Sequence, residues 1–218
     1  MDQTALSYLS GAIGDGCLVK RSNIKRYDIQ FYQKNKEWLE KSVLNRLLKL
    51  GITTKMRGPY KSCWYLKFGN KQLYQWLEAN QLKLPSGDRE SKVLFVRGFW
   101  DAEGSCPHVE KYLAGERKRK KIPPQVGFHQ NGHDKVELLN SVRSFLIENG
   151  IECSKLEGPF YREQSNKPEF RFWVYGRKRI AKFISLIQPE HPEKRNRLEL
   201  LLGTRGLRTV NSDRLKVA

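Results

Sequence analysis

The sequence predicts a mixed α/β fold built from two similar halves, and three observations support this prediction. Two apolar segments each end in an acidic residue followed by glycine, at residues 9–16 (LSGAIGDG) and 95–104 (FVRGFWDAEG). Downstream of each lies a run with the features of a half-buried strand, and then an amphipathic helix that stops at a glycine. Further matching segments follow in the same order, at a spacing that grows along the chain.

In the first half, a strand is expected at residues 27–34, because Ile29 and Phe31 alternate with polar neighbours. An amphipathic helix is expected over residues 36–50, where it stops before Gly51. The remaining elements expected in this half are a turn at 57–60 (RGPY), a strand at 64–68, a short helix around 73–77 and a linker at 85–88 (PSGD).

The second half repeats this order. A helix over residues 134–148 ends near Gly150, and the sequence EGPF at 157–160 matches RGPY in the first half. The extra residues of this copy fall mainly between Gly104 and Gln130, where we expect a long basic hairpin loop. The duplication implies a pseudo-twofold molecule of two αββαββα halves. The expected boundaries are 1–86 for the first half, 87–92 for the linker, 93–205 for the second half and 206–218 for a basic tail.

The composition predicts a polyanionic partner. Lys and Arg number 41 against 23 Asp and Glu, which gives a formal net charge of +18. Polyanions of this kind are DNA, ribosomal RNA and an acidic membrane surface. The sequence has no long apolar run and no signal sequence, so we expect a protein of the cytoplasm or an organellar matrix that is neither secreted nor inserted in a membrane. The four cysteines show no C-x-x-C spacing and are expected to be reduced.

The two acids at the ends of the apolar segments are unusual for helix C-termini. The macrodipole favours cations there, and an acid costs about 0.3–1 kcal/mol. Gly11, Ala12 and Gly98 lack bulky side chains, so the two helices could cross closely and bring Asp15 and Glu103 together. Oxygen ligands at such a place suit a hard cation such as Mg²⁺. The alternative interpretation is two buried helices with ordinary acid–glycine turns.

The segment FVRGFWDAEG is similar to the LAGLIDADG motif of the homing endonucleases. Residues 96–104 match the motif in length, with glutamate in place of the final aspartate. The residues on the family's positions are Gly98, Asp101, Ala102, Glu103 and Gly104. In LSGAIGDG the middle glycine, Gly11, comes one residue late relative to Asp15. Either the helix is shifted, with Ser10 in the small-residue position, or this motif is one residue short.

The resemblance covers nearly the whole chain and implies a single-chain, intron-encoded enzyme that acts as a monomer. Its two motif helices would pack at the centre, and its antiparallel sheets would form a DNA-binding saddle. The implied activity is metal-dependent, site-specific cleavage of both strands of a long, asymmetric DNA target. Each acid would serve one strand and ligate Mg²⁺, helped by backbone carbonyls near Gly14 and Ala102. Mn²⁺ is expected to substitute for Mg²⁺, and Ca²⁺ to support binding without cleavage.

The resemblance also implies roles for residues beside the acids. Gln33 and Gln130 fall where the family places a polar residue that orders solvent around the metals. Lys194 resembles the family's lysine near the scissile phosphate; its counterpart in the first half is a glycine, so Lys34 is expected to substitute for it. The structural alternatives are that Lys194 opens a helix and that Gln33 caps a strand end.

Polar residues on the exposed strand faces and nearby loops are expected to contact DNA. A β-ribbon can lie in the major groove and read base edges, while Lys and Arg also hold phosphates. The alternative is a solvated sheet face. The expected contacts in the first half are Lys20, Arg21, Lys25, Arg26, Asp28, Gln30, Tyr32, Lys55, Arg57, Lys61 and Lys67. Those in the second half are Lys118, Gln125, His129, Tyr161, Arg162 and Arg171.

Two other function classes remain open from the sequence. One is a non-cleaving nucleic-acid binder on the same scaffold, either a maturase that assists the splicing of intron RNA or a DNA-binding regulator. The other is a basic ribosome-associated protein. Loss of one or both acids would favour a non-cleaving protein, and both acids are present.

Overall fold

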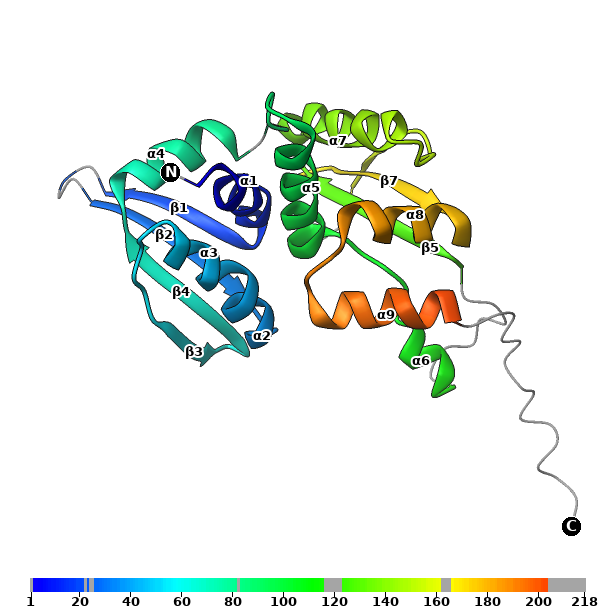
Figure 1. Ribbon diagram of the computed structural model, residues 1–218, viewed down its shortest axis with the longest axis horizontal. Helices are drawn as coiled ribbons and strands as arrows, with labels where there is room; N and C mark the ends of the chain where they lie inside the picture. Colours follow the sequence, from blue (N-terminus) through cyan, green and yellow to red (C-terminus); the bar gives the residue numbers. More distant parts are fainter. Residues whose placement is uncertain are drawn as a thin grey trace, which may run out of the picture.

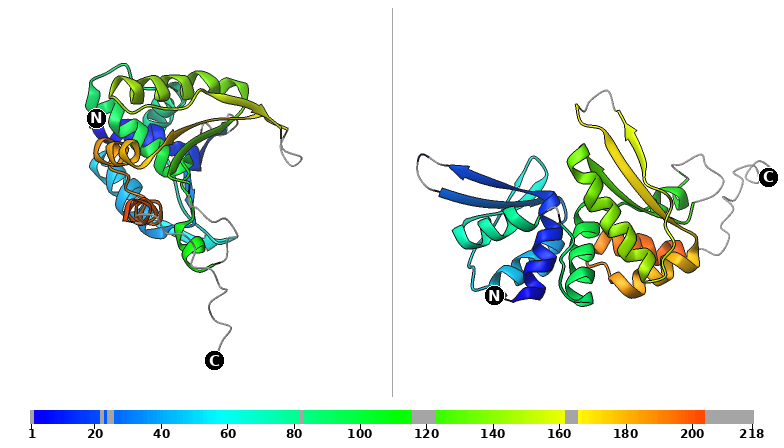
Figure 2. Two further views of the ribbon diagram at one scale, coloured as in Figure 1. Left: turned by 90° about the vertical axis from the view of Figure 1, so that its right-hand side faces the viewer. Right: turned by 90° about the horizontal axis from the view of Figure 1, so that it is seen from above.

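A computed structural model describes residues 2–21, 23, 26–81, 83–115, 123–161 and 166–203. The chain forms two halves that lie side by side, and each contains an antiparallel sheet with helices on one face (Figure 1). The helix-free faces of the two sheets lie on the same side of the molecule (Figure 2). The part of the chain that the structure describes contains no helix long and apolar enough to cross a membrane.

The first half follows the expected αββαββα order, with a four-stranded sheet in the order β1-β2-β4-β3. The helix expected over residues 36–50 is present, but its middle section is π-helical. The elements are α1 (Gln3–Ala12), η1 (Ile13–Asp15), β1 (Gly16–Arg21), β2 (Arg26–Gln33), α2 (Lys36–Trp38), η3 (Leu39–Leu44), α3 (Asn45–Lys49), β3 (Met56–Tyr60), β4 (Cys63–Gly69) and α4 (Lys71–Asn80).

The second half keeps the same core arrangement with differences at its edges. Its described strands form a sheet in the order β5-β7-β6. The elements are α5 (Arg89–Glu103), α6 (Val109–Leu113), β5 (Gln125–Asn131), η4 (His133–Lys135), α7 (Val136–Glu148), β6 (Glu157–Phe160), β7 (Glu169–Tyr175), α8 (Arg177–Ile187) and α9 (Pro192–Gly203). Where the first half has β1, Ser105 forms an isolated bridge to Gly127. Within the expected basic loop, residues 109–113 are helical, while residues 116–122 lie outside the described part of the chain.

Two local predictions are wrong. The segments RGPY and EGPF are not turns but the strands β3 and β6, and each contains a cis Gly–Pro peptide bond. Both strands lie at sheet edges, where a proline removes no ladder hydrogen bond. The expected linker at 87–92 is also too long, because Asp88 caps α5 by accepting a hydrogen bond from the backbone N–H of Ser91, so residues 89–92 are helical.

Each half has its own hydrophobic core, and α5 contributes to both. Ile29 and Phe31 of β2 are fully buried beneath the helices of the first half. Phe128 of β5 belongs to the core of the second half. Leu94 and Ala102 of α5 pack into the core of the first half. The two halves therefore meet along α1 and α5, which lie side by side at the centre of the molecule (Figures 1 and 2).

Glycines allow α1 and α5 to touch backbone to backbone. A Cβ atom added to Gly11 would lie 2.1 Å from the carbonyl oxygen of Phe95. One added to Gly98 would lie 2.2 Å from the carbonyl oxygen of Tyr8. No side chain fits at either position, so the expected close packing of the two motif helices is confirmed.

Candidate active site

The crossing of α1 and α5 brings the two acids together. Asp15 ends η1 and Glu103 ends α5. The side chain of Glu103 lies against Gly14, where an added Cβ atom would be 2.6 Å from Oε1 of Glu103. Burial and the negative charge of Glu103 raise the pKa of Asp15 to about 7, and burial also raises the pKa of Glu103. The metal-free protein therefore holds two partly buried carboxyl groups that repel each other when both are ionised.

The first motif is one residue short, and η1 compensates for the missing residue. Gly11 precedes Asp15 by four residues, whereas Gly98 precedes Glu103 by five. Three residues of 3₁₀-helix rise about 6 Å, the same as four residues of α-helix. Gly11 faces α5, while the hydroxyl of Ser10 donates to the carbonyl oxygen of Ser7 in its own helix. Of the two alternatives left open by the sequence, the structure supports the shorter motif.

Each acid accepts a hydrogen bond from a glutamine near the end of a matched strand. Nε2 of Gln33 donates to Oδ2 of Asp15 at 2.6 Å, and Gln130 makes the corresponding side-chain hydrogen bond to Glu103. Both bonds lower the pKa of their acid and so oppose the effect of burial. The backbone N–H of Lys34 donates to Oε1 of Gln33 at 2.7 Å and fixes the orientation of its amide. The structure thus brings both predicted glutamines to the acids.

Lys194 supplies the cation that the C-terminus of α5 lacks in its own sequence. Its Nζ donates to the carbonyl oxygens of Trp100, Asp101 and Ala102 at 3.1, 2.7 and 3.0 Å. Burial lowers the pKa of Lys194, and its positive charge lowers the pKa of both Asp15 and Glu103. One lysine therefore acts on both acids. Lys34 is exposed, and its assignment as the first-half lysine stays a prediction.

Asp101 anchors the segment that carries Lys194. Its carboxylate is fully buried and accepts hydrogen bonds at 3.1 Å from the backbone N–H groups of Glu190 and His191. It also accepts one at 2.9 Å from the hydroxyl of Tyr8 in the first half. Burial raises the pKa of Asp101 to about 6 despite these three donors. This role of Asp101 was not predicted, although an acid within an apolar helical run indicates that its carboxylate has buried partners.

An ion-pair cluster connects the same segment to α3 and to α5. Glu190 accepts hydrogen bonds from Arg46 of the first half at 2.6 and 2.8 Å, and from Arg97 of α5 at 3.2 Å. Burial acts to raise the pKa of Glu190, but the hydrogen bonds and charge of Arg46 outweigh it and hold the pKa below its ordinary value. Arg46 also lies 3.6 Å above the ring of Tyr8. Through Glu190, the segment before α9 therefore binds both the first half and α5.

The donor set at the acids fits a hard divalent cation but is sparse. Among the described residues, no group of three or more His, Cys, Asp and Glu side chains could hold a metal ion. Two repelling carboxylates attract a cation such as Mg²⁺, which also retains several water ligands or binds substrate phosphates. The carbonyl oxygen of Ala102, expected as a metal ligand, accepts the hydrogen bond from Lys194. The two carboxylates are thus the principal protein ligands available.

The helix-free sheet faces carry most of the predicted DNA contacts. In the first half Arg21, Arg26, Tyr32, Lys55, Arg57 and Lys61 are exposed, and Lys67 is half-buried. Lys20 is also exposed, but it pairs with Tyr27, whose ring packs on Tyr74 of α4, so it lies on the helical face of the sheet and not on the expected one. In the second half Tyr161 is exposed, while Gln125, His129 and Arg171 are half-buried. Nε2 of His129 lies 2.5 Å from the hydroxyl oxygen of Ser105, within hydrogen-bond distance. Lys25, Lys118 and Arg162 lie outside the described residues.

Two expected contacts are covered rather than exposed. Asp28 is 0% exposed, because Arg21 and Arg26 form ion pairs over it. Gln30 is 7% exposed, and its Oε1 accepts a hydrogen bond from the hydroxyl of Tyr32. The period-two pattern placed both residues on the outer face, but it carried no information about the neighbouring side chains that cover them.

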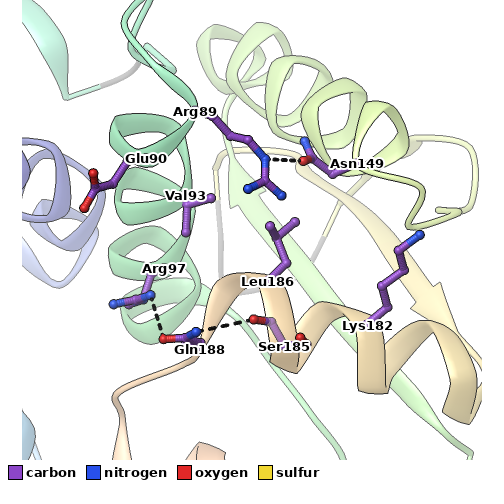
Figure 3. Close-up of a pocket in the computed structure, with 9 residues that line it drawn as sticks. All are labelled: Arg89, Glu90, Val93, Arg97, Asn149, Lys182, Ser185, Leu186 and Gln188. Carbon is purple, nitrogen blue, oxygen red and sulfur yellow. Dashed lines mark hydrogen bonds between the residues drawn. The ribbon is translucent and has the colours of Figure 1, made fainter.

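A separate cavity of about 580 Å³ lies on the helical side of the second half, between α5, α7 and α8 (Figure 3). At its rim Nε of Arg89 donates to Asn149 at 2.8 Å, and Arg97 lies beside Gln188 (Figure 3). None of its lining residues belongs to the set that the sequence predicted for the site. The cavity is therefore distinct from the place where the acids meet.

Comparison with known proteins gives a sequence relative and several solved structures of similar fold. No family model matches the chain. The homing endonuclease I-ApeI from Aeropyrum pernix is 32% identical over 123 residues, which cover 48% of this chain and 54% of I-ApeI. The chain thus spans about half the length of this curated relative. Mesophilic variants of the homing endonuclease I-DmoI superpose with a TM-score of 0.62 at 16% identity, over 87% of this chain and 98% of that one.

The chain has the single-chain LAGLIDADG fold. A structure of I-DmoI in complex with DNA and Ca gives a TM-score of 0.61 at 17% identity, over 84% of this chain and 89% of that one. The LAGLIDADG fold also occurs in full-length WhiA from Thermatoga maritima, with a TM-score of 0.58 at 15% identity over 94% of this chain and 61% of that one. The fold thus occurs both in homing endonucleases and in WhiA.

Proposed function

We propose that this chain is a metal-dependent, site-specific endonuclease that cuts both strands of a long DNA target. The observation that carries the proposal is the meeting of Asp15 and Glu103 at the ends of two crossed helices, each with its own glutamine. A protein that only binds nucleic acid by charge has no use for two matched, partly buried acids. The net charge of +18 and the two helix-free sheet faces supply the surface for DNA.

The residues of the site support hydrolysis in distinct ways. Bound Mg²⁺ would lower the pKa of a water molecule and stabilise the charge that develops on the phosphate. Asp15 and Glu103 would hold the metal ions, and Gln33 and Gln130 keep each carboxylate oriented. Lys194 places a positive charge beside both acids, where it would also attract the scissile phosphates. Each acid would serve one DNA strand.

Relatives of similar fold support the choice of metal and substrate. Structures of I-DmoI have been solved in complex with DNA and Ca, with DNA and Mn, and with target DNA in the presence of Mg. By analogy, Mg²⁺ and Mn²⁺ would support cleavage by this chain, and Ca²⁺ would support binding alone. The protein would act as a monomer, since one chain contains both acids, and it would work in the cytoplasm or an organellar matrix.

A second candidate is a non-cleaving nucleic-acid binder, because this fold is not confined to homing endonucleases and also occurs in WhiA. An intron RNA maturase belongs to this class as well as a DNA-binding regulator. Both site acids are retained here, together with both glutamines and Lys194. This machinery favours cleavage over binding alone.

A two-stage selection tests the proposal. Random duplex DNA fragments are captured with the protein in Ca²⁺, washed at moderate salt and then given Mg²⁺. We expect one enriched sequence that is cut on both strands. Enrichment without cutting would support the regulator, and no enrichment of DNA would direct the search to RNA.

Substitutions of the two acids then test the assignment of one acid to each strand. Glu103→Gln should bind the selected target with little change and nick it, because one strand alone is cut at the normal rate. Asp15→Asn should leave the opposite strand intact. Denaturing electrophoresis of end-labelled duplexes distinguishes the two strands. If either variant loses DNA binding, that acid is structural and the proposed mechanism is wrong.

A further inference from the structure

The helix-free faces of the two sheets both carry arginines held by carboxylates, but the local charges differ in sign. On the first sheet Nε of Arg26 lies 2.7 Å from Asp28, and Nε of Arg21 lies 3.7 Å from it. Two arginines and one aspartate give this cluster a formal charge of +1. On the second sheet Arg171 lies between Glu157 and Glu169. His129 lies 3.4 Å from the same oxygen of Glu169 that faces Arg171. With this imidazole counted as neutral, Arg171 and the two glutamates carry a formal charge of −1.

Arg171 is held in a defined orientation. Its Nε lies 3.3 Å from Oε2 of Glu157, and its Nη1 lies 3.7 Å from Oε1 of Glu169. Its guanidinium carbon is 4.3 Å from the ring centre of Phe160 and 5.8 Å from that of Trp173. The glutamates engage two of the three nitrogens, and a guanidinium has five N–H donors in total. The Nη2 amino group and part of Nη1 therefore remain available, and the side chain is 32% exposed.

This environment disfavours a phosphate as the partner of Arg171. A phosphate approaching the guanidinium would also meet the carboxylates of Glu157 and Glu169, and like charges brought together at an interface repel each other. A guanine edge instead presents two neutral acceptors, O6 and N7, spaced for a bidentate contact with arginine. The contacts with the rings of Phe160 and Trp173 order the Arg171 side chain before DNA binds. Less side-chain entropy is therefore lost when the guanidinium contacts a base. The cluster thus suits an uncharged base edge.

We propose that Arg171 reads a guanine in the half of the DNA target that the second sheet covers. This inference rests on the proposed function, because it assumes that the helix-free faces lie in the grooves of duplex DNA. Arg26, in a cluster of positive charge, holds the DNA backbone in the other half of the target. The two sheets consequently contribute unequally to sequence recognition, with base readout by Arg171 in one and backbone contact by Arg26 in the other.

Binding selections with randomised duplexes in Ca²⁺ test the proposal without requiring cleavage. The wild-type protein should prefer guanine at one position in the half-site under the second sheet. Arg171→Gln should lose that preference by about 5- to 150-fold, the range for a bidentate arginine–guanine contact, and change other positions little. Arg171→Lys keeps the charge but lacks the planar fork, so it should also lose the preference. The thermal unfolding midpoints of Arg171→Gln and Arg171→Lys verify that both variants are folded.

Arg26→Gln is the matched control, because it removes an arginine held by a carboxylate from the other sheet. It should weaken binding to all sequences alike and reduce the slope of log affinity against log salt by about one. Uniform weakening by both Arg171 variants would show a phosphate contact and overturn the proposal. Retention of the guanine preference in both variants would overturn it as well. If the wild-type protein cuts a specific target in either case, the proposed endonuclease function stands; if it selects no duplex, both proposals fail.

Discussion

Asp15 and Glu103 occupy matching ends of the two motif helices, but the two halves build those ends in different ways. Glu103 ends a regular α-helix whose last carbonyl groups are bound by Lys194. Asp15 ends a 3₁₀ turn that follows a shorter motif. Each acid has its own glutamine partner. A single lysine, Lys194 of the second half, lowers the pKa of both acids. The duplication therefore preserved the acids and their glutamines, while the cation comes from the second half.

This asymmetry shows which parts of the site the crossing of α1 and α5 fixes. The close approach at Gly11 and Gly98 brings the helix ends together whatever their local conformation. Once the acids meet, a single buried ammonium group is near enough to lower the pKa of both. Asp15 and Glu103 therefore differ in their local structure, and this difference is compatible with cleavage of both DNA strands.

The largest effect is expected when the shared cation is removed. Lys194→Met should slow cleavage of both strands by about 100-fold, the lower end of the range for losing one donor that stabilises transition-state charge. Lys34→Met tests the sequence-based assignment of Lys34 in the same assay: if Lys194 alone serves both acids, this variant leaves both rates nearly unchanged. Single-turnover cleavage of each end-labelled strand measures the two rates separately. If Lys194→Met slows one strand alone and Lys34→Met slows the other, each half has its own lysine and the sequence-based assignment of Lys34 is right.

A smaller, strand-specific effect is expected from the glutamines. Gln33→Ala should slow the strand that depends on Asp15 by about 10-fold, because partners that orient metal-binding groups typically contribute 10–100-fold. Gln130→Ala should slow the other strand by a similar factor. The same strand-resolved assay applies, with metal titrations to detect weaker affinity. Equal slowing of both strands by either variant would show that the two sites do not work independently.

The smallest effect is a pH dependence of stability in metal-free protein. The pKa of Asp15 is about 7 in the folded state against an ordinary value of 3.8, so the folded protein binds this proton more tightly than the unfolded chain does. The contribution to stability is complete below pH 4 and is lost as the pH rises towards 7. Asp15→Asn should therefore flatten the decline of the urea midpoint between pH 4 and 7 in EDTA. Parallel declines in the variant and the wild-type protein would contradict the raised pKa; Asp101 has a raised pKa in both proteins and cancels in the comparison.

Sequence reasoning identified the acids, the glutamines and the duplication because each leaves a local or repeated pattern. The apolar runs ended by Asp15 and Glu103 are visible along the chain, and the matched strand ends placed Gln33 and Gln130 beside them. The position of Lys194 near an acid site also followed from the resemblance. The acids and the duplication follow from helix and strand periodicity, which a sequence records directly, whereas the roles of Gln33, Gln130 and Lys194 were implied by the resemblance alone.

Features that depend on distant partners were missed. Asp101 binds backbone groups nearly 90 positions away, and nothing in its own segment indicates which residues those are. Asp28 lies on the expected face of β2, yet the arginines above it remove it from solvent. The strands β3 and β6 were mistaken for turns because a Gly–Pro pair is a turn signal unless the strand lies at a sheet edge. In each case tertiary neighbours decided the outcome.

The ties made by the segment before α9 limit how freely the two halves can be exchanged. Glu190 binds Arg46 of the first half, Asp101 accepts from Tyr8, and Lys194 reaches the end of α5. A hybrid protein that joined two copies of the first half would contain two acids but no counterpart of Lys194 or Glu190. One that joined two copies of the second half would contain two such lysines and lack the partners Arg46 and Tyr8. Recombination between proteins of this fold at the connection between α4 and α5 would therefore need a compatible pair of halves, rather than any first half with any second half.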